Sequence, residues 1–485
     1  MPAKANLKRI AALLAITCAA ILIHGYHPYI EDAEIYAPGI KQILHPDLYP
    51  YNQAFFASHA HLTLFPNLIA VSARITHLPL DWVLFVWHFC TVFALLLACW
   101  RVAALLFRDP LAPWSAVALI AALLTLPVAG TALYIMDQYV NPRSISTPAI
   151  LFGFANFGEK KFLRATIWIV FTGLIHPLMV LFGGVFLACY FVLNRRFALK
   201  CDVPLLGLPL TFIPKVSEAY REVLDSHSYF LVTRWEWYEW LGALAPLLIL
   251  WWLGQVAKKQ RLRTLAVLCR SLIVFQIVFL IMGLVVCAPS LAAFSRIQPM
   301  RALHLLYVFL FIMCGGLLAQ AVLKTQVWRW LALLIPICLG MWFAQQQLFP
   351  ATEHLELPGR ASRNQWVEAF VWIREHTPTD AYFALNPDHM ELRGEDQHGF
   401  RAIAERSMLA DRIKDSGAVS MFPQLANTWQ EQVKAQTNWS HFSPQDLQRL
   451  KQTYGVNWIV RESAPPTGLL CPYKNAAVRV CRIDD

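Results

Sequence analysis

The stretch "IAALLAITCAAILIHGYHPYIEDAEIY", residues 10–36, joins an apolar run directly to three carboxylates, Glu31, Asp32 and Glu34. Basic residues precede the run and no small-residue cleavage site follows it, so we expect a retained first membrane helix and not a cleaved signal. Acidic side chains beside hydrocarbon lose their solvation, so they are usually paired, placed in a watery cavity or used for chemistry. Which role applies depends on the side of the membrane that they face.

The composition indicates an integral membrane protein. Of the 485 residues, 57% are hydrophobic and 15% are charged, and the mean hydropathy is +0.45. A chain this apolar is not typical of a soluble protein. The formal net charge of +10 is explained by the Lys and Arg of cytoplasmic loops, so we expect no nucleic-acid partner. Most of the 11 cysteines lie in or beside apolar runs, without the Cys/His spacing of a structural zinc site.

Basic clusters such as "EKKFLR" (159–164) and "AKKQRLR" (257–263) recur between the apolar runs and set the orientation. If all of them are cytoplasmic, the sequence predicts about eleven spans, with the N-terminus inside and the C-terminus outside. The approximate spans are 9–24, 82–107, 113–133, 141–157, 162–176, 178–193, 202–213, 239–256, 264–287, 301–322 and 328–347. A crossing at 61–77 would put every later basic cluster on the wrong face, so we expect this segment to be interfacial or re-entrant.

On this topology the first loop, residues 25–61, faces outside together with three other polar stretches. They are "MDQYVNPRSISTP" (136–148), "GLIHPLM" (173–179) and "SRIQPMRALH" (295–304). Polar residues at helix breaks near a membrane need a cavity or protein neighbours to solvate the freed backbone groups, and membrane substrate sites are built in the same way. We therefore expect one outer site that includes residues of all four stretches: Glu31, Asp32, Asp137, Arg143, His176, Arg296, Arg301 and His304.

The acidic residues of this set also have structural interpretations. Glu31 or Asp32 could cap the helix that begins in "DAEIYAPGIKQIL" (32–44). Asp137 and Arg143 could form an ion pair with a structural role.

The basic residues have alternatives too. His176 before Pro177 could be a turn histidine, and Arg296 and Arg301 could reach lipid headgroups. A functional site is favoured because acids, histidines and arginines are predicted on one face, whereas the cytoplasmic loops are merely basic.

The order of these features resembles the GT-C glycosyltransferase superfamily, in particular a bacterial branch with a Tyr-His-Pro-Tyr-x-Glu-Asp motif in its first loop. The likeness is carried by "GYHPYIEDAEIYAPGIKQILHPDLYP" (25–50), "MDQYVNPRSISTP", "GLIHPLM" and "NQWVEAFVWIREHTPTDAYFALNP" (364–387). The resemblance implies a mainly α polytopic protein of the bacterial inner membrane, a GT-C-like helical bundle with an extracytoplasmic C-terminal domain. It also implies an inverting transferase that uses a polyprenyl-phosphate-linked sugar and attaches it to a glycan, lipid or protein acceptor.

When such a donor reacts, its lipid phosphate departs as an anion, so cations must stabilise the negative charge that develops on the phosphate oxygen. Arg143, Arg296 and Arg301 are the candidates, because a guanidinium group offers a planar fork that matches phosphate oxygens. His176 and His304 are further substrate-binding candidates.

The acceptor hydroxyl must lose a proton as it attacks the sugar, and a nearby carboxylate can accept it. In the superfamily the acidic residue of the first loop is the candidate general base or metal contact, and this role maps to Asp32 or, as second choice, Glu31. Asp137 could hold the geometry or help to coordinate a divalent ion such as Mg²⁺ or Mn²⁺. The residue spacing does not decide whether a metal is used.

Residues 349–485 are charged and mixed in composition, which predicts an extracytoplasmic α/β domain after a transmembrane domain of residues 1–348. We expect helices in "RNQWVEAFVWIREH" (363–376) and "SPQDLQRLKQTYG" (443–455) and strands in "AYFAL" (381–385), "VNWIV" (456–460) and "AAVRVCRI" (476–483). Cys471 and Cys481 could form a disulfide in an oxidising compartment. The polar stretch "PDHMELRGEDQHGFR" (387–401) is expected to be a solvated loop, or else a cover over the membrane site that contacts the acceptor.

Two other function classes remain open at this point: a transporter or flippase for a lipid-linked glycan, and a catalytically silent scaffold of envelope assembly. Transporters often show internal repeats and charged residues at mid-membrane depth. This sequence shows no evident repeat, and its ionisable groups gather at one surface. The transferase is therefore favoured.

Overall fold

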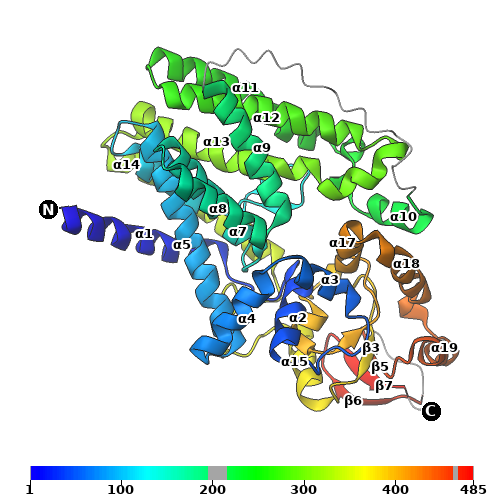
Figure 1. Ribbon diagram of the computed structural model, residues 1–485. Helices are drawn as coiled ribbons and strands as arrows, with labels where there is room; N and C mark the ends of the chain where they lie inside the picture. The colour runs from blue at the N-terminus through cyan, green and yellow to red at the C-terminus, as the bar shows by residue number, and fades with distance from the viewer. Residues whose placement is uncertain (1, 195–215, 463–467, 484–485) are drawn as a thin grey trace.

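The computed structural model describes residues 2–194, 216–462 and 468–483, and helices dominate it. Long helices form a bundle, and the elements that follow residue 348 gather at one end, beside α2 and α3 (Figure 1). The helices before residue 348 are α1 (Pro2–His24), α2 (Ala33–Leu44), α3 (Ala54–Leu62), α4 (Phe65–Thr76), α5 (Leu80–Leu106), α6 (Ala112–Ala122), α7 (Pro142–Gly158), α8 (Phe162–Ile175), α9 (Pro177–Asn194), α10 (Glu218–Ser226), α11 (Trp237–Lys259), α12 (Arg263–Val285), α13 (Leu303–Leu318) and α14 (Val327–Leu348).

Within the described residues, seven helical segments are long and apolar enough to cross a membrane, or eight if the bent pair α3 and α4 forms one span. They comprise α1, α5, α9, α11, α12, a segment over Pro289–Leu323 that includes α13, and α14. The protein is thus mainly helical, with several helices able to span a membrane. The predicted total of about eleven is not confirmed: α6, α7 and α8 have only 11, 17 and 14 residues, and the expected span 202–213 lies outside the described residues. The 85° bend between α3 and α4 fits a broken span or a re-entrant loop.

The helix expected over 113–133 is shorter than predicted. It ends at Ala122 and is followed by a small antiparallel hairpin of β1 (Pro127–Val128) and β2 (Leu133–Tyr134). Pro127 lacks the N–H that a continued helix would need. Gly130 makes the turn at φ 64°, and a Cβ there would lie 2.4 Å from the ring of Trp235.

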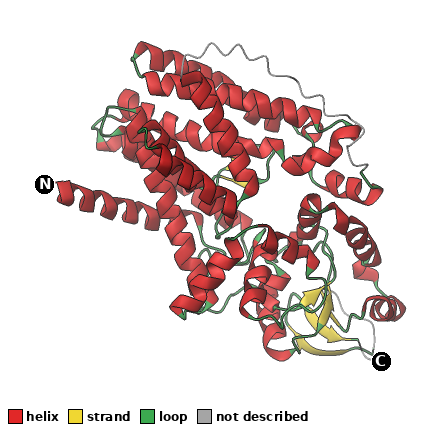
Figure 2. Cartoon of the chain, in the orientation of Figure 1, coloured by secondary structure: helices red, strands yellow, loops and turns green. Residues whose placement is uncertain are grey.

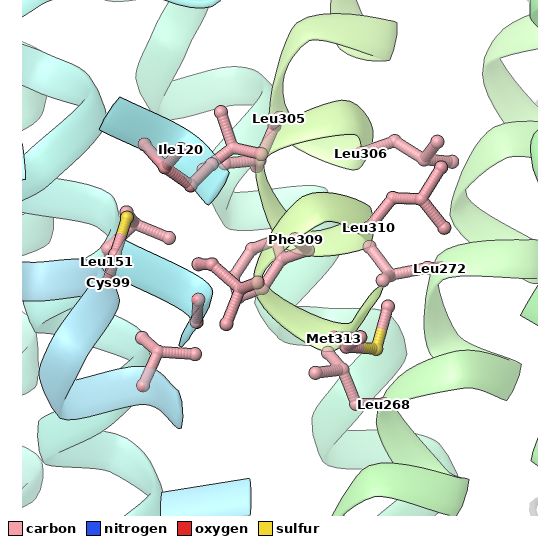
Figure 3. Packing of buried hydrophobic residues seen from close by; sticks show 14 of the residues in the cluster. Cys99, Ile120, Leu151, Leu268, Leu272, Leu305, Leu306, Phe309, Leu310 and Met313 are labelled. Carbon is pink, nitrogen blue, oxygen red and sulfur yellow. The ribbon is translucent and has the colours of Figure 1, made fainter. Parts of the chain in front are cut away.

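The largest core lies around α13, which passes through the middle of the bundle. Its side chains Leu305, Leu306, Phe309, Leu310 and Met313 pack against residues of α5, α6, α7 and α12 (Figure 3). Gly315 lets α6 approach closely, because a Cβ there would lie 2.6 Å from the Cα of Ala116. Close contact through small residues is a main source of helix association in lipid.

Residues 382–482 contain a five-stranded sheet with the strand order β4-β3-β5-β7-β6, seen as the yellow arrows near the C-terminus in Figure 2. Strand β3 runs parallel to β4 and β5, and the other two pairings are antiparallel. The strands are β3 (Tyr382–Ala384), β4 (Ser407–Met408), β5 (Trp458–Arg461), β6 (Leu470–Lys474) and β7 (Arg479–Arg482). The helices are α15 (Gln365–His376), α16 (Phe400–Ala404), α17 (Lys414–Met421), α18 (Ala426–Ala435) and α19 (Pro444–Tyr454).

The alternation of side chains along the strands explains how the sheet is covered. Phe383, Val460 and Val480 pack with α15 on one face. Tyr382 and Ile459 pack with α19 on the other face. The small C-terminal sheet unit is therefore built from strands and helices, as its sequence pattern predicts, and the helices lie on both faces of the sheet.

The predicted helix ends of this region are found. The side chain of Ser443 caps α19 in a reciprocal pair with Asp446, and Gly455 ends the helix at φ 79°. A disulfide joins Cys471 of β6 to Cys481 of β7.

The expectation of a solvated loop at 387–401 is wrong for most of the stretch, because Pro387, His389 and Met390 are buried, and so are most of residues 395–401. They lie against the first loop: the N–H of Gly399 donates to the carbonyl of Tyr29 at 2.8 Å, and the N–H of Glu31 donates to the carbonyl of Gln397 at 2.9 Å. The polar groups of this segment thus find partners in a part of the chain more than 350 residues away.

Candidate functional site

A cavity of about 760 Å³ lies where the first loop, the β1–β2 hairpin, the start of α7 and α17 meet. We call it the large cavity. Five of the predicted site residues line it, although they come from distant parts of the chain: Glu31, Asp32, Asp137, Arg143 and Arg301. Three of the four polar stretches therefore converge on this cavity.

A second cavity of about 190 Å³, the small cavity, adjoins the first. Its walls include the apolar side chains of Ile35, Leu62 and Leu178, which come from α2, α3 and α9. Five residues line both cavities: Asp32, Arg143, Tyr229, Arg301 and Gly417. The carboxylate and the two arginines therefore stand at the junction of a larger space with acidic and basic walls and a smaller, more apolar one.

Asp32 stands at the N-cap position of α2, but its side chain makes no capping hydrogen bond to the helix. The chain enters this position through Glu31 in the left-handed conformation, at φ 54°, and the backbone N–H of Asp32 donates to the Tyr139 hydroxyl at 3.1 Å. The capping interpretation of Asp32 is therefore not supported. Its carboxylate is left to face the cavities.

The charges around Asp32 keep it ionised. Lys414 Nζ donates to Asp32 Oδ1 at 3.4 Å and also pairs with Glu31. Burial on its own would raise the pKa of Asp32, but three positive charges outweigh burial and lower the pKa to about 2. In order of effect they are Lys414, Arg301 and Arg143.

Glu34, the third carboxylate of the opening stretch, has a different place. It is buried away from both cavities and accepts the backbone N–H groups of Arg401 at 3.0 Å and Ala402 at 2.9 Å. The Arg401 guanidinium also reaches Glu34, at 3.3 Å, and binds both oxygens of Asp415 on α17. Glu34 therefore fixes the first loop to the C-terminal elements and helps to position α17.

Asp137 and Arg143 form an ion pair within the wall of the large cavity. Asn141 also donates to the same Asp137 oxygen, at 2.6 Å, while its own side chain caps α7. The Asp137 carboxylate is therefore already engaged by a guanidinium and an amide, and we derive no step through a metal. Among the residues that the structure describes, no group of three His, Cys, Asp or Glu side chains is arranged to hold an ion.

Arg301 is the best placed cation for an anionic ligand. Its guanidinium lies over the ring of Tyr229 at 4.6 Å, and its Nε is buried with no hydrogen-bond partner. Within the described part of the chain Arg301 has no salt bridge, whereas Arg143 and Lys414 are both paired with carboxylates.

The remaining predicted residues lie at different distances from the junction. His176, between α8 and α9, lines the small cavity. His304 is buried and its Nε2 donates to the carbonyl of Ile135 at 3.0 Å, so it supports the chain next to the cavity but does not line it. Arg296 is exposed at the end of the 3₁₀ helix η4 (Pro289–Ile297) and lines neither cavity.

The large cavity is also lined by four residues that no sequence pattern predicts: Lys414, Tyr229, Gly417 and His227. His227 Nε2 shares a hydrogen bond of 2.7 Å with Ser416 Oγ, and burial, followed by the charges of Lys414 and Arg301, lowers its pKa to about 4. These residues lie in segments without a recognisable motif. Lys414 reaches the site through its ion pairs with Glu31 and Asp32, whereas His227 is held by Ser416 of α17 and Tyr229 lies against Arg301.

No protein-family model matches this chain, and no curated protein is significantly similar to it. Functional interpretation must therefore start from the two cavities and the charges between them.

Proposed function

We propose that this protein is an integral membrane glycosyltransferase that moves a sugar from a polyprenyl-phosphate-linked donor to an acceptor on the outer face of the bacterial inner membrane. The observation that carries the proposal is the placement of Asp32, Arg143 and Arg301 at the junction of the two cavities. Such a reaction needs a carboxylate that can accept a proton, a group that binds phosphate, and separate spaces for lipid and sugar.

The donor would lie across this junction. The phosphate fits at Arg301, whose guanidinium has free donor capacity, with Arg143 close enough to add its charge. The start of the isoprenoid chain would occupy the small cavity, against apolar residues such as Leu62 and Leu178. The sugar would then point into the large cavity, where the acceptor also has room.

The reaction follows from this arrangement. The acceptor hydroxyl oxygen attacks the anomeric carbon, and a new carbon–oxygen bond forms while the bond from that carbon to the phosphate oxygen breaks. The hydroxyl proton passes to the ionised carboxylate of Asp32. The lipid phosphate leaves with the electron pair as an anion, and the arginines stabilise it. Attack from the side opposite to the leaving phosphate inverts the configuration of the sugar.

Replacement of Gly417 by a bulky residue tests this proposal without altering a charged residue. Gly417 lines both cavities, and a Cβ built there meets nothing within 4 Å. Gly417→Trp should fill the junction and abolish transfer from lipid extract to acceptor by the purified protein in lipid nanodiscs. Gly417→Ala is the matched control; it leaves the cavities open and, in a helix interior, should add about 0.5–1 kcal/mol of stability.

Both variants should melt at or above the wild-type temperature. Transfer by Gly417→Trp at the rate of Gly417→Ala would contradict a reaction site at these cavities.

A further inference from the structure

We propose that Lys414 is an exchangeable counter-ion: before the donor binds it neutralises Glu31 and Asp32, and when the donor binds its ammonium group turns to the phosphate. This inference rests on the proposed function and adds a step that prepares the site. It gives the C-terminal elements a direct part in the reaction at the membrane.

The position of Lys414 allows such an exchange. It is the first residue of α17, it pairs with Glu31, and its Nζ lies 3.4 Å from Asp32 Oδ1. All three side chains line the large cavity, and those of Glu31 and Asp32 are 32% and 33% exposed. The ion pair is thus reached from the cavity and is not sealed inside the protein.

The backbone of α17 can stay in place while the side chain turns. Asp415, the next residue, is bound through both oxygens by Arg401 at 3.0 and 2.7 Å, and Arg401 is bound in turn by Glu34. The helix is therefore fixed to the first loop one residue away from Lys414. A lysine ammonium is a compact charge with three donors on a flexible stem, which suits it to move between partners.

The charge balance around the junction favours movement of Lys414 over movement of the arginines. The large cavity is lined by three cations, Arg143, Arg301 and Lys414, and by five carboxylates, Glu31, Asp32, Asp137, Glu239 and Glu391. Arg143 is held by Asp137, and the Arg301 guanidinium is held over the ring of Tyr229. A phosphate adds negative charge to this set, and Lys414 is the cation that can rotate toward it.

The exchange would also increase the basicity of the Asp32 carboxylate. Burial raises the pKa of Asp32, and Lys414 is foremost among the charges that lower it. When Lys414 turns away, Asp32 loses the positive charge that lowers its pKa most and becomes a stronger proton acceptor. Asp32 would therefore gain basicity when the donor is present.

Binding of farnesyl phosphate, a short isoprenyl phosphate without a sugar, tests the exchange on the full-length protein in detergent. Lys414→Met should weaken binding about 10- to 100-fold, because one charge-assisted hydrogen bond to phosphate is lost. Glu31→Gln removes the carboxylate that competes for Lys414 and should tighten binding about 5-fold or more. Lys414→Arg keeps the charge and should bind within a few-fold of the wild type.

The double variant distinguishes exchange from a fixed salt bridge: Glu31→Gln should tighten binding only while Lys414 is present to turn to the phosphate, so equal tightening in the Lys414→Met background would reflect charge alone and overturn the inference. Shifts in the same direction, or unchanged binding by Lys414→Met at an unchanged melting temperature, would overturn the inference. The proposed transferase activity is judged separately: sugar transfer by the wild type with no change in binding rejects the exchange alone, and opposite binding shifts without any transfer reject the transferase alone.

Discussion

Replacement of Asp32 by Asn separates a catalytic carboxylate from a structural one. The substitution keeps the shape of the side chain and removes most of its basicity. Because the Asp32 side chain does not cap α2, no capping bond is lost. Among the residues that the structure describes, the one ion pair of Asp32 that the change weakens is with Lys414, at 3.4 Å on a partly exposed carboxylate.

The two interpretations differ in magnitude. A partly exposed ion pair contributes about 0–1 kcal/mol to stability, so the melting temperature should change little. Loss of a general base typically lowers the rate by about 10²–10⁴-fold, which corresponds to about 3–5 kcal/mol in the activation free energy. A large kinetic effect with a small effect on stability is therefore expected.

The assay measures transfer from the native lipid donor and thermal unfolding on the same preparations of wild type, Asp32→Asn and Glu31→Gln. Asp47→Asn is the control, because Asp47 is an exposed carboxylate of the same loop and should leave both quantities unchanged. Wild-type transfer by Asp32→Asn would refute the assignment of Asp32 as the base. If Glu31→Gln alone abolished transfer, the role would move to Glu31.

Three further predictions concern the contacts around the site. Glu34→Ala removes the acceptor of two buried N–H groups and a partner of Arg401. This substitution should lower the unfolding free energy by about 3 kcal/mol. Glu34→Gln keeps an acceptor oxygen and should lower the unfolding free energy less. Burial lowers the pKa of His398, but the Glu356 carboxylate outweighs burial and raises the pKa to about 9. The contribution of this pair to the unfolding free energy should therefore be complete below pH about 6.5 and be lost as the pH rises through about 9. Melting curves of His398→Gln should lack this loss. Cys471 and Cys481 should be recovered as one linked peptide in non-reducing mapping, and alkylation of both without reductant would reject the bond.

Much of the fold can be predicted because its signals are local. Long apolar runs mark helices such as α5 and α12, and the capping residues Ser443 and Gly455 mark the ends of α19. Local signals fail where the chain departs from a continuous run: the hairpin after Ala122 lies inside an apolar stretch, and only Pro127 and Gly130 indicate it.

Part of the site could also be predicted from local sequence signals. The sequence topology predicts that Asp32, Asp137, Arg143 and Arg301 lie on one face, and the structure brings all four to one cavity. Lys414 could not be predicted, because its role depends on a pairing with Glu31 across 383 residues.

The lipid that accompanies the purified protein tests the central claim most directly. Mass spectrometry of lipid extracted from wild-type protein should show an isoprenoid phosphate that carries a sugar. The same extraction from Arg301→Gln should show it depleted at least tenfold, because Arg301 is the cation with free donor capacity at the junction of the cavities. Bulk phospholipid alone in the wild type, or the same isoprenoid phosphate in equal amount in both proteins, would contradict a donor site between these cavities.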